Sequence, residues 1–404
     1  MRLAWRRPGT GSIRSGPRST DGTAGDRPPG HDCDGDAAPG VGRASPILST
    51  RERWAGRKES SMRRSWNWSL VAVLLTVGIA LGLGVGSLDA QQKNLLVSKK
   101  VGAPPPMDPA MGEAWKDAQP LTFKVLGGKN LPGGSTEVTL RSVYTGDTVY
   151  FLVQYKDPTE SFRRGPWVKQ ADGSWQQLKD PDDKGGDNNK YYEDKMAMIW
   201  NISSPAFEAR GCMAACHTGE GKPFGNKYLP NPGERADIWH WKSVRTGSVG
   251  QFDDQYLDAT RYDKDKAPEA GRKSDPKTGG GYADNVGDDK KGPKWALPGN
   301  KPAPPYWIVD AEKTPLDDSK YKAGDEVPGI IVAPFTGDRG DISVKSAWKE
   351  GTWTLVFARR LVTGSDFDVQ FNDMKKEYAF GVAVFDNAQV RHAYSPGVLK
   401  LRFE

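Results

Sequence analysis

Short segments of alternating apolar and polar residues recur along the chain, and this period of two is typical of β-strands. The clearest pair covers residues 137–144 and 147–155, and a Thr-Gly pair separates them. That spacing predicts a β-hairpin. The same pattern predicts further strands over residues 195–201, 342–348, 353–359, 378–385 and 398–403.

Many short strands predict an all-β fold, an antiparallel β-sandwich with long irregular loops. The longest interruption is residues 263–305, which are rich in Gly, Lys, Asp and Pro. We expect this stretch to be an irregular excursion over the surface.

An apolar run at residues 70–85 follows Met62 and two arginines. As a helix it would be about 24 Å long, which is shorter than the roughly 30 Å hydrocarbon core of a membrane. Residues 62–90 therefore predict a secretory signal peptide, cleaved after Ala90. Retention of residues 69–86 as an N-terminal membrane anchor is the alternative.

This leader sets the expected domain organisation and location. Residues 1–61 hold Arg, Gly, Pro and Ser without apolar periodicity, and we expect them to be an untranslated or disordered extension. Residues 91–404 are then one β-sandwich domain. The signal peptide predicts a periplasmic or exported protein, membrane-anchored if the segment is retained.

The net charge changes once the leader is set aside. Of 57 Lys+Arg and 51 Asp+Glu, residues 1–90 hold 13 and 8, which leaves 44 against 43. A near-neutral mature chain argues against a nucleic-acid partner, because phosphate binding needs a basic surface. Three cysteines in 404 residues are too few for a disulfide scaffold.

The segment from Cys212 to His217 carries the most informative chemistry, because Cys212, Cys216 and His217 form a C-x-x-x-C-H motif. Two thiols followed by an adjacent imidazole are how a c-type haem is attached, although the usual spacing is C-x-x-C-H. Three other interpretations stay open: a small disulfide loop, a zinc site completed by His217 and His240, or free thiols.

The order of several segments resembles the ethylbenzene dehydrogenase gamma-subunit-like haem-binding domain. The segments are residues 141–155, 193–200, 236–242, 368–371 and 380–392, and the resemblance covers most of residues 105–404. It implies a β-sandwich with a haem pocket for one haem. It also implies an electron-transfer subunit of periplasmic molybdenum oxidoreductases of the dimethyl sulfoxide reductase type.

The resemblance implies partners as well: a molybdopterin catalytic subunit, an iron-sulfur subunit and other cytochromes. The chain departs from the best-known gamma subunits, which hold a b-type haem between a Met and a Lys and lack a Cys-Cys-His segment. This chain therefore looks like a c-type branch with one covalent haem c, and haem b is the alternative.

With haem on the two cysteines, His217 is the expected proximal iron ligand. Candidates for the distal position are His392, His240 and Met198, in that order. His392 follows the predicted strand over residues 378–385, in the region where the family resemblance places a late ligand. A methionine ligand would raise the reduction potential relative to a second imidazole.

The alternatives for these side chains are ordinary structural roles: a solvated loop for His392, an aromatic cluster for His240, and core packing for Met198 and its neighbour Met196. Trp200, Trp239 and Trp241 are expected in the core first. Lys195 and Lys242 are candidates for haem propionates or the iron, with surface salt bridges as the favoured interpretation.

The sequence shows no Ser-His-Asp arrangement and no phosphate-cradling glycine loop. We therefore expect an exported cytochrome that carries one haem and has no substrate-converting site of its own. The alternatives are a non-redox ligand- or carbohydrate-binding sandwich module and a haem-based sensor.

Overall fold

The computed structural model describes residues 94–183, 187–214 and 227–404. These residues form mostly β-strands, and the one α-helix among them is α2 (Pro205–Arg210). The short 3-10 helices are η1 (Pro109–Trp115), η2 (Pro132–Gly134), η3 (Gly211–Ala214), η4 (Gly247–Val249), η5 (Pro298–Asn300), η6 (Asp310–Glu312), η7 (Asp318–Lys320) and η8 (Asp338–Gly340).

A 13-stranded sheet makes up the main body. Its strands are β1 (Leu95–Lys100), β2 (Leu121–Leu126), β3 (Ser135–Tyr144), β4 (Thr148–Lys156), β7 (Lys195–Asn201), β8 (Ala236–Lys242), β9 (Asp253–Leu257), β10 (Arg272–Ser274), β17 (Ser343–Lys349), β18 (Thr352–Arg360), β19 (Tyr378–Phe385), β20 (Ala393–Tyr394) and β21 (Leu399–Phe403).

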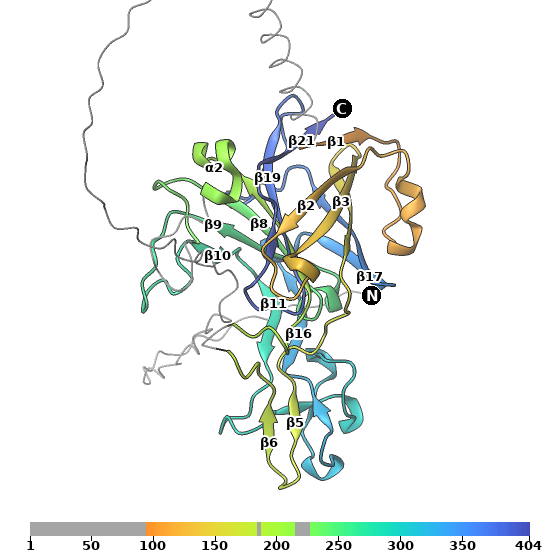
Figure 1. Ribbon diagram of the computed structural model, residues 1–404, viewed down its shortest axis with the longest axis vertical. Helices are drawn as coiled ribbons and strands as arrows, with labels where there is room; N and C mark the ends of the chain where they lie inside the picture. The colour runs from red at the N-terminus through yellow and green to blue at the C-terminus, as the bar shows by residue number, and fades with distance from the viewer. Residues whose placement is uncertain (1–93, 184–186, 215–226) are drawn as a thin grey trace, which may run out of the picture. The chain divides into compact units, whose positions relative to one another are not determined.

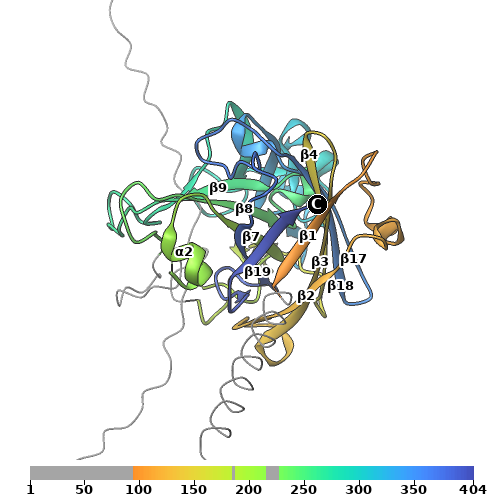
Figure 2. The same cartoon turned by 90° about the horizontal axis from the view of Figure 1, so that it is seen from above.

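The sheet bends into two layers. One layer has the order β10-β9-β8-β7-β19, and the other has the order β3-β4-β18-β17. The short strands β21 and β20 pair with β19, while β1 and β2 pair with β3, and these four strands join the layers along one edge (Figure 2). The predicted all-β sandwich is confirmed. The 13-stranded sheet is antiparallel except at β1, which runs parallel to both β21 and β3.

The core lies between the two layers and is rich in aromatic side chains. Trp200 and Trp239 come from β7 and β8, with ring centroids 4.9 Å apart. Phe151 of β4 lies 5.8 Å from Trp239 and stacks on Phe357 of β18 at 5.1 Å. Alternate residues of each strand face this interior, which is the period of two that the sequence shows.

The predicted hairpin is confirmed, because β3 and β4 pair from Val138–Tyr155 to Tyr144–Val149. The turn predicted between residues 348 and 353 is present as well. Glu350 and Gly351 both have positive φ, 50° and 72°, which suits a two-residue hairpin turn with the twist of the flanking strands.

Three smaller sheets extend from this body. One holds β11 (Gly279–Asp284), β16 (Ile330–Thr336) and β13 (Ile308–Val309). Another holds β15 (Glu326–Val327), β5 (Trp167–Lys169) and β6 (Trp175–Gln177), at the lower end of Figure 1. The third pairs β12 (Trp295–Ala296) with β14 (Thr314–Pro315).

Residues 263–305 differ from the irregular excursion that their composition predicts. They include β10, which extends the main sheet beside β9, and β11, which pairs with β16. The glycines of β11 serve close packing: a Cβ on Gly280 would lie 1.7 Å from the carbonyl oxygen of Pro334. Here glycine allows two backbones to meet at a register shift of the strand pair.

The predicted extension over residues 1–61 and the predicted signal peptide or anchor lie outside the described residues. Within residues 94–183, 187–214 and 227–404, no helix has the length and apolar character that crossing a membrane requires.

Candidate functional site

The outer face of the β9-β8-β7-β19 layer has a floor of small and aliphatic side chains. Ala197 of β7 pairs with Ala383 of β19, and the next row on the same face pairs Ile199 with Gly381. Ala197, Ile199 and Ala383 are each half-buried. Small residues in the middle of a sheet leave room for another group to approach the backbone closely.

Cys212 lies on this floor. It belongs to η3, directly after α2, whose N-terminus Ser204 caps by accepting a hydrogen bond from the Phe207 backbone N–H at 3.3 Å. The buried Phe207 ring anchors α2, and Cys212 itself is 6% exposed. A Cβ on Gly381 would lie 3.2 Å from the Cys212 sulfur, so glycine at this position makes room for the thiol.

The other two residues of the predicted attachment motif, Cys216 and His217, lie outside the described residues. The covalent haem and the proximal ligand therefore stay predictions.

His240 and His392 both lie on this outer face, and both rings contact the ring of Phe385. The ring centroid of Phe385 lies 5.7 Å from that of His240 and 4.7 Å from that of His392. His392 is 7% exposed, so the solvated-loop interpretation is wrong. Its burial comes from Phe385 and from Tyr394, whose ring centroid lies 6.0 Å away.

Hydrogen bonds indicate the same tautomer for both histidines. Nδ1 of His392 lies 2.9 Å from the Val390 carbonyl oxygen, which can only accept, so Nδ1 donates. Nδ1 of His240 lies 3.4 Å from Oε1 of Gln255, an oxygen that also accepts from Arg272 at 3.2 Å. In both rings Nε2 then carries the lone pair that metal ligation uses.

Met198 lies on the opposite side of β7. It pairs with Trp239 and Val382 and is fully buried in the core, as is Met196. The structure therefore brings His240 and His392 to the face that holds Cys212 and does not bring Met198 there. Trp200, Trp239 and Trp241 also occupy the core, the role that the sequence analysis places first.

Lys195 and Lys242 are buried instead of forming the surface salt bridges that the sequence favours. Nζ of Lys195 donates to the Gln389 carbonyl oxygen at 2.7 Å and lies 4.1 Å from the centre of the Phe385 ring. Nζ of Lys242 forms a 2.5 Å ion pair with Asp253. The two lysines pair across β7 and β8, so both point to the outer face beside His240.

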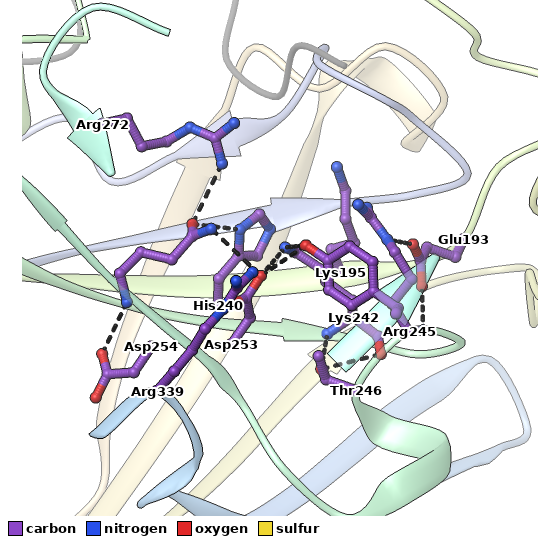
Figure 3. Close-up of polar contacts among 12 residues, drawn as sticks. Glu193, Lys195, His240, Lys242, Arg245, Thr246, Asp253, Asp254, Arg272 and Arg339 are labelled. Carbon is purple, nitrogen blue, oxygen red and sulfur yellow. Dashed lines mark hydrogen bonds and ion pairs between the residues drawn. The ribbon is translucent and has the colours of Figure 1, made fainter. Parts of the chain in front are cut away.

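Figure 3 shows the buried polar network into which Lys242 and His240 fit. Asp253 accepts from Lys242, from Arg339 at 2.6 Å and from the Tyr282 hydroxyl at 2.8 Å. Burial alone would raise the pKa of the Asp253 carboxyl, but the charges of Lys242 and Arg339 hold it far below its ordinary value. Asp253 therefore stays ionised.

Asp253 also accepts from Gln255 at 3.3 Å, which links this ion cluster to His240. Sequence reasoning misses Gln255 and Phe385 as neighbours of the histidines. The available signal is strand alternation: once β9, β8, β7 and β19 are paired in that order, His240, Asp253, Gln255 and Phe385 all share one face.

A second buried ion cluster borders the site at Glu193. Its carboxylate accepts from Arg245 and from the backbone N–H groups of Val244 and Arg245 at 2.8 and 2.9 Å. Arg164 lies 3.6 Å away. Burial would raise the pKa of the Glu193 carboxyl, but Arg245 and Arg164 lower it below its ordinary value.

Comparison with known protein families finds a match over most of this chain. The family model described as ethylbenzene dehydrogenase matches residues 112–396. The chain belongs to the ethylbenzene dehydrogenase family. The matched range contains the whole outer face described above, including Cys212, His240 and His392. A search of curated proteins finds no match.

Solved structures give more distant similarities. A putative carbohydrate-binding protein from Bacteroides uniformis ATCC 8492 is 13% identical, with a TM-score of 0.31 and coverage of 77% of this chain and 99% of that chain. A carbohydrate binding module family 9 from Caldicellulosiruptor kristjanssonii in complex with glucose is 6% identical, with a TM-score of 0.28 and coverage of 77% and 95%. Similarity at this level says nothing about a ligand of this chain.

Proposed function

We propose that this member of the ethylbenzene dehydrogenase family is an exported cytochrome that carries one haem c on the outer face of the β7-β19 layer. It transfers electrons to or from a periplasmic molybdopterin oxidoreductase of the dimethyl sulfoxide reductase type, as a gamma-like subunit or soluble partner. The partner complex supplies the molybdopterin and iron-sulfur centres, and this chain needs no substrate-converting site.

The observation that carries the proposal is the position of Cys212 on a floor of small residues beside two imidazoles. A flat macrocycle needs an apolar surface without bulky side chains, which Ala197, Ala383 and Gly381 supply. Cys212, the first thiol of the C-x-x-x-C-H motif, lies over this floor, which supports attachment of the macrocycle there. A thiol for covalent attachment and two imidazoles as candidate iron ligands are the donors that a c-type haem uses.

The remaining roles follow from these contacts. When bound, haem iron supplies one-electron redox chemistry. Cys212 and Cys216 hold the macrocycle, and His217 is the proximal ligand. His392 is the first distal candidate and His240 the second, while Met198 could reach the outer face only by leaving the core. Lys195 lies beside the site as a candidate for a propionate, whereas the charge of Lys242 is already balanced by Asp253.

We expect the chain, co-expressed with cytochrome c maturation factors, to contain one covalent haem by mass spectrometry and by its pyridine haemochrome spectrum. The double variant Cys212→Ala/Cys216→Ala should lose the covalent haem. Haem that acid acetone extracts would favour a b-type subunit, and a folded chain without haem would favour a non-redox binding module. Either result contradicts the c-type proposal.

The distal ligand is tested by comparing His392→Ala with His240→Ala in the haem-loaded chain. Loss of the imidazole that ligates iron should change the low-spin absorption bands and open a coordination position, whereas loss of the other should leave them unchanged. We expect the change in His392→Ala, and carbon monoxide binding reports the open position. An unchanged spectrum in both variants would rule out both histidines and point to another donor.

A further inference from the structure

A second cluster of polar side chains lies at the opposite face of β8 from the haem-site candidate, at the end of the sandwich interior. Asp237 of β8, Asp254 of β9 and Asp368 of the loop before β19 each offer one carboxylate oxygen, and these oxygens lie within 4.8 Å of one another. All three side chains are buried. Three carboxylates brought together without water repel one another strongly.

A fourth carboxylate, that of Asp275, lies against Asp368 of this triad. Asp275 follows β10, is 3% exposed, and has no hydrogen-bond partner for either carboxylate oxygen among the described residues. It also forms a group with Asp338 and Asp368 whose oxygens lie within 4.8 Å. Asp275 is thus a buried side chain with both oxygens unsatisfied, and it lies against Asp368 of the triad.

The other three aspartates also keep oxygens unsatisfied. Oδ2 of Asp237 accepts from the Trp239 indole N–H and the Val369 backbone N–H, both at 2.9 Å, but its Oδ1 accepts from none of the described residues. The same is true of Oδ2 of Asp254 and Oδ1 of Asp368. Buried acceptors in such number are unusual, because buried polar groups are normally hydrogen-bonded.

Few basic side chains balance the negative charge of these four aspartates. Arg359 is the one basic side chain of the described residues that forms an ion pair with the four aspartates, at 2.7 Å to Asp368 and 3.6 Å to Asp237. Four buried carboxylates thus face one guanidinium. The cluster therefore needs either protons or a cation.

A comparison inside the molecule favours a cation for this cluster. Carboxylate oxygens of Asp157, Asp194 and Asp386 also lie within 4.8 Å of one another. Both oxygens of Asp194, however, already accept hydrogen bonds from N–H groups. One oxygen each of Asp157 and Asp386 also accepts a hydrogen bond. Protein donors and a shared proton can satisfy that triad, whereas in the Asp237 cluster four carboxylates share few donors and both oxygens of Asp275 accept from none of the described residues.

We propose that Asp237, Asp254, Asp275 and Asp368 form a calcium site. An all-carboxylate set is the ligand type of hard cations. Calcium fits better than magnesium, because it accepts six to eight oxygens in irregular geometry, while magnesium retains several waters in a near-ideal octahedron. The ion would tie β8, β9 and the end of β10 to the loop before β19.

The test uses the full chain, stripped of metal with EDTA. We expect saturating CaCl2 to raise the melting temperature by about 5 °C, since ligand binding at about 100 times Kd shifts stability by that order in a domain of this size. Tb³⁺ should luminesce on excitation of tryptophan, because Trp239 contacts Asp237, and Ca²⁺ should suppress this signal by competition.

Asp275→Asn and Asp254→Asn should abolish both responses. Asp157→Asn is the matched control from the other buried triad and should retain both. A wild-type chain with no calcium-dependent rise and no Tb³⁺ signal would overturn the proposal, and so would an equal rise in Asp275→Asn. If Asp275→Asn fails to fold, the Tb³⁺ titration of Asp254→Asn decides by the same criterion.

Discussion

Replacing Glu193 with alanine should lower the free energy of unfolding by about 3–5 kcal/mol. Glu193 and Arg245 are both fully buried and form an ion pair. The alanine variant leaves the Arg245 guanidinium in the interior without its carboxylate, and two backbone N–H groups lose their acceptor. Urea unfolding followed by tryptophan fluorescence measures the change.

Glu326→Ala is the matched control. Its ion pair with Arg163 is partly exposed, with side-chain exposures of 17% for Glu326 and 43% for Arg163. Solvent screens such a pair, so we expect a loss of about 0–1 kcal/mol. A loss below about 1 kcal/mol for Glu193→Ala would mean that water reaches Arg245 in the variant, which would contradict the burial described above.

Local alternation predicts the strands well because it directly records which side chains a sheet buries. The segment predicted over residues 378–385 is β19 with the same bounds, and residues 195–201 are β7. The period of two also assigns Met196, Met198 and Trp200 to one face. Such predictions need only neighbouring residues, so a single sequence suffices for them.

Side chains whose surroundings come from distant strands are less predictable. The sequence leaves a solvated loop open as the alternative role of His392, but Phe385 and Tyr394 bury its ring. Lys195 and Lys242 read as surface lysines, but pairing of β7 with β8 brings them together on a covered face. The partners of these residues come from distant segments of the chain, so the neighbouring sequence does not predict them.

The candidate site shows the same division. The sequence singles out Cys212, His240 and His392 by residue type, and the fold brings all three to one face of the sheet. It gives no indication that Gly381 makes room for Cys212, because the two are far apart in the chain. Asp194 and Asp237, which form no recognisable acid–base pair in the sequence, each belong to a different buried aspartate triad.

The triad of Asp157, Asp194 and Asp386 should make stability fall as pH rises from about 5 to about 8. Burial, and then the neighbouring carboxylates, raise the pKa of Asp157 to about 9, and burial raises that of Asp194 to about 8. None of the three forms an ion pair with a Lys or Arg in the part of the chain that the structure describes. The folded triad therefore keeps a proton that the unfolded chain releases near pH 4.

The sign follows from proton linkage. Below pH 4 both states are protonated and the full contribution is present, and between pH 4 and the raised pKa the folded state binds more protons, so stability declines with pH. One retained proton corresponds to about 1.4 kcal/mol per pH unit, or about 4 kcal/mol between pH 5 and 8. Urea unfolding at several pH values measures this slope, with calcium present to keep the Asp237 cluster loaded.

Asp157→Asn should remove this dependence, because its amide donates a hydrogen bond at every pH where the carboxyl needs a proton to do so. We expect a slope that is shallower by about 1.4 kcal/mol per pH unit and a variant more stable than wild type at pH 8. The exposed Asp117→Asn change, equal in chemistry, should leave the slope unchanged. Equal slopes in wild type and Asp157→Asn would mean that the triad is ionised in the folded protein, and a cation would then be needed there as well.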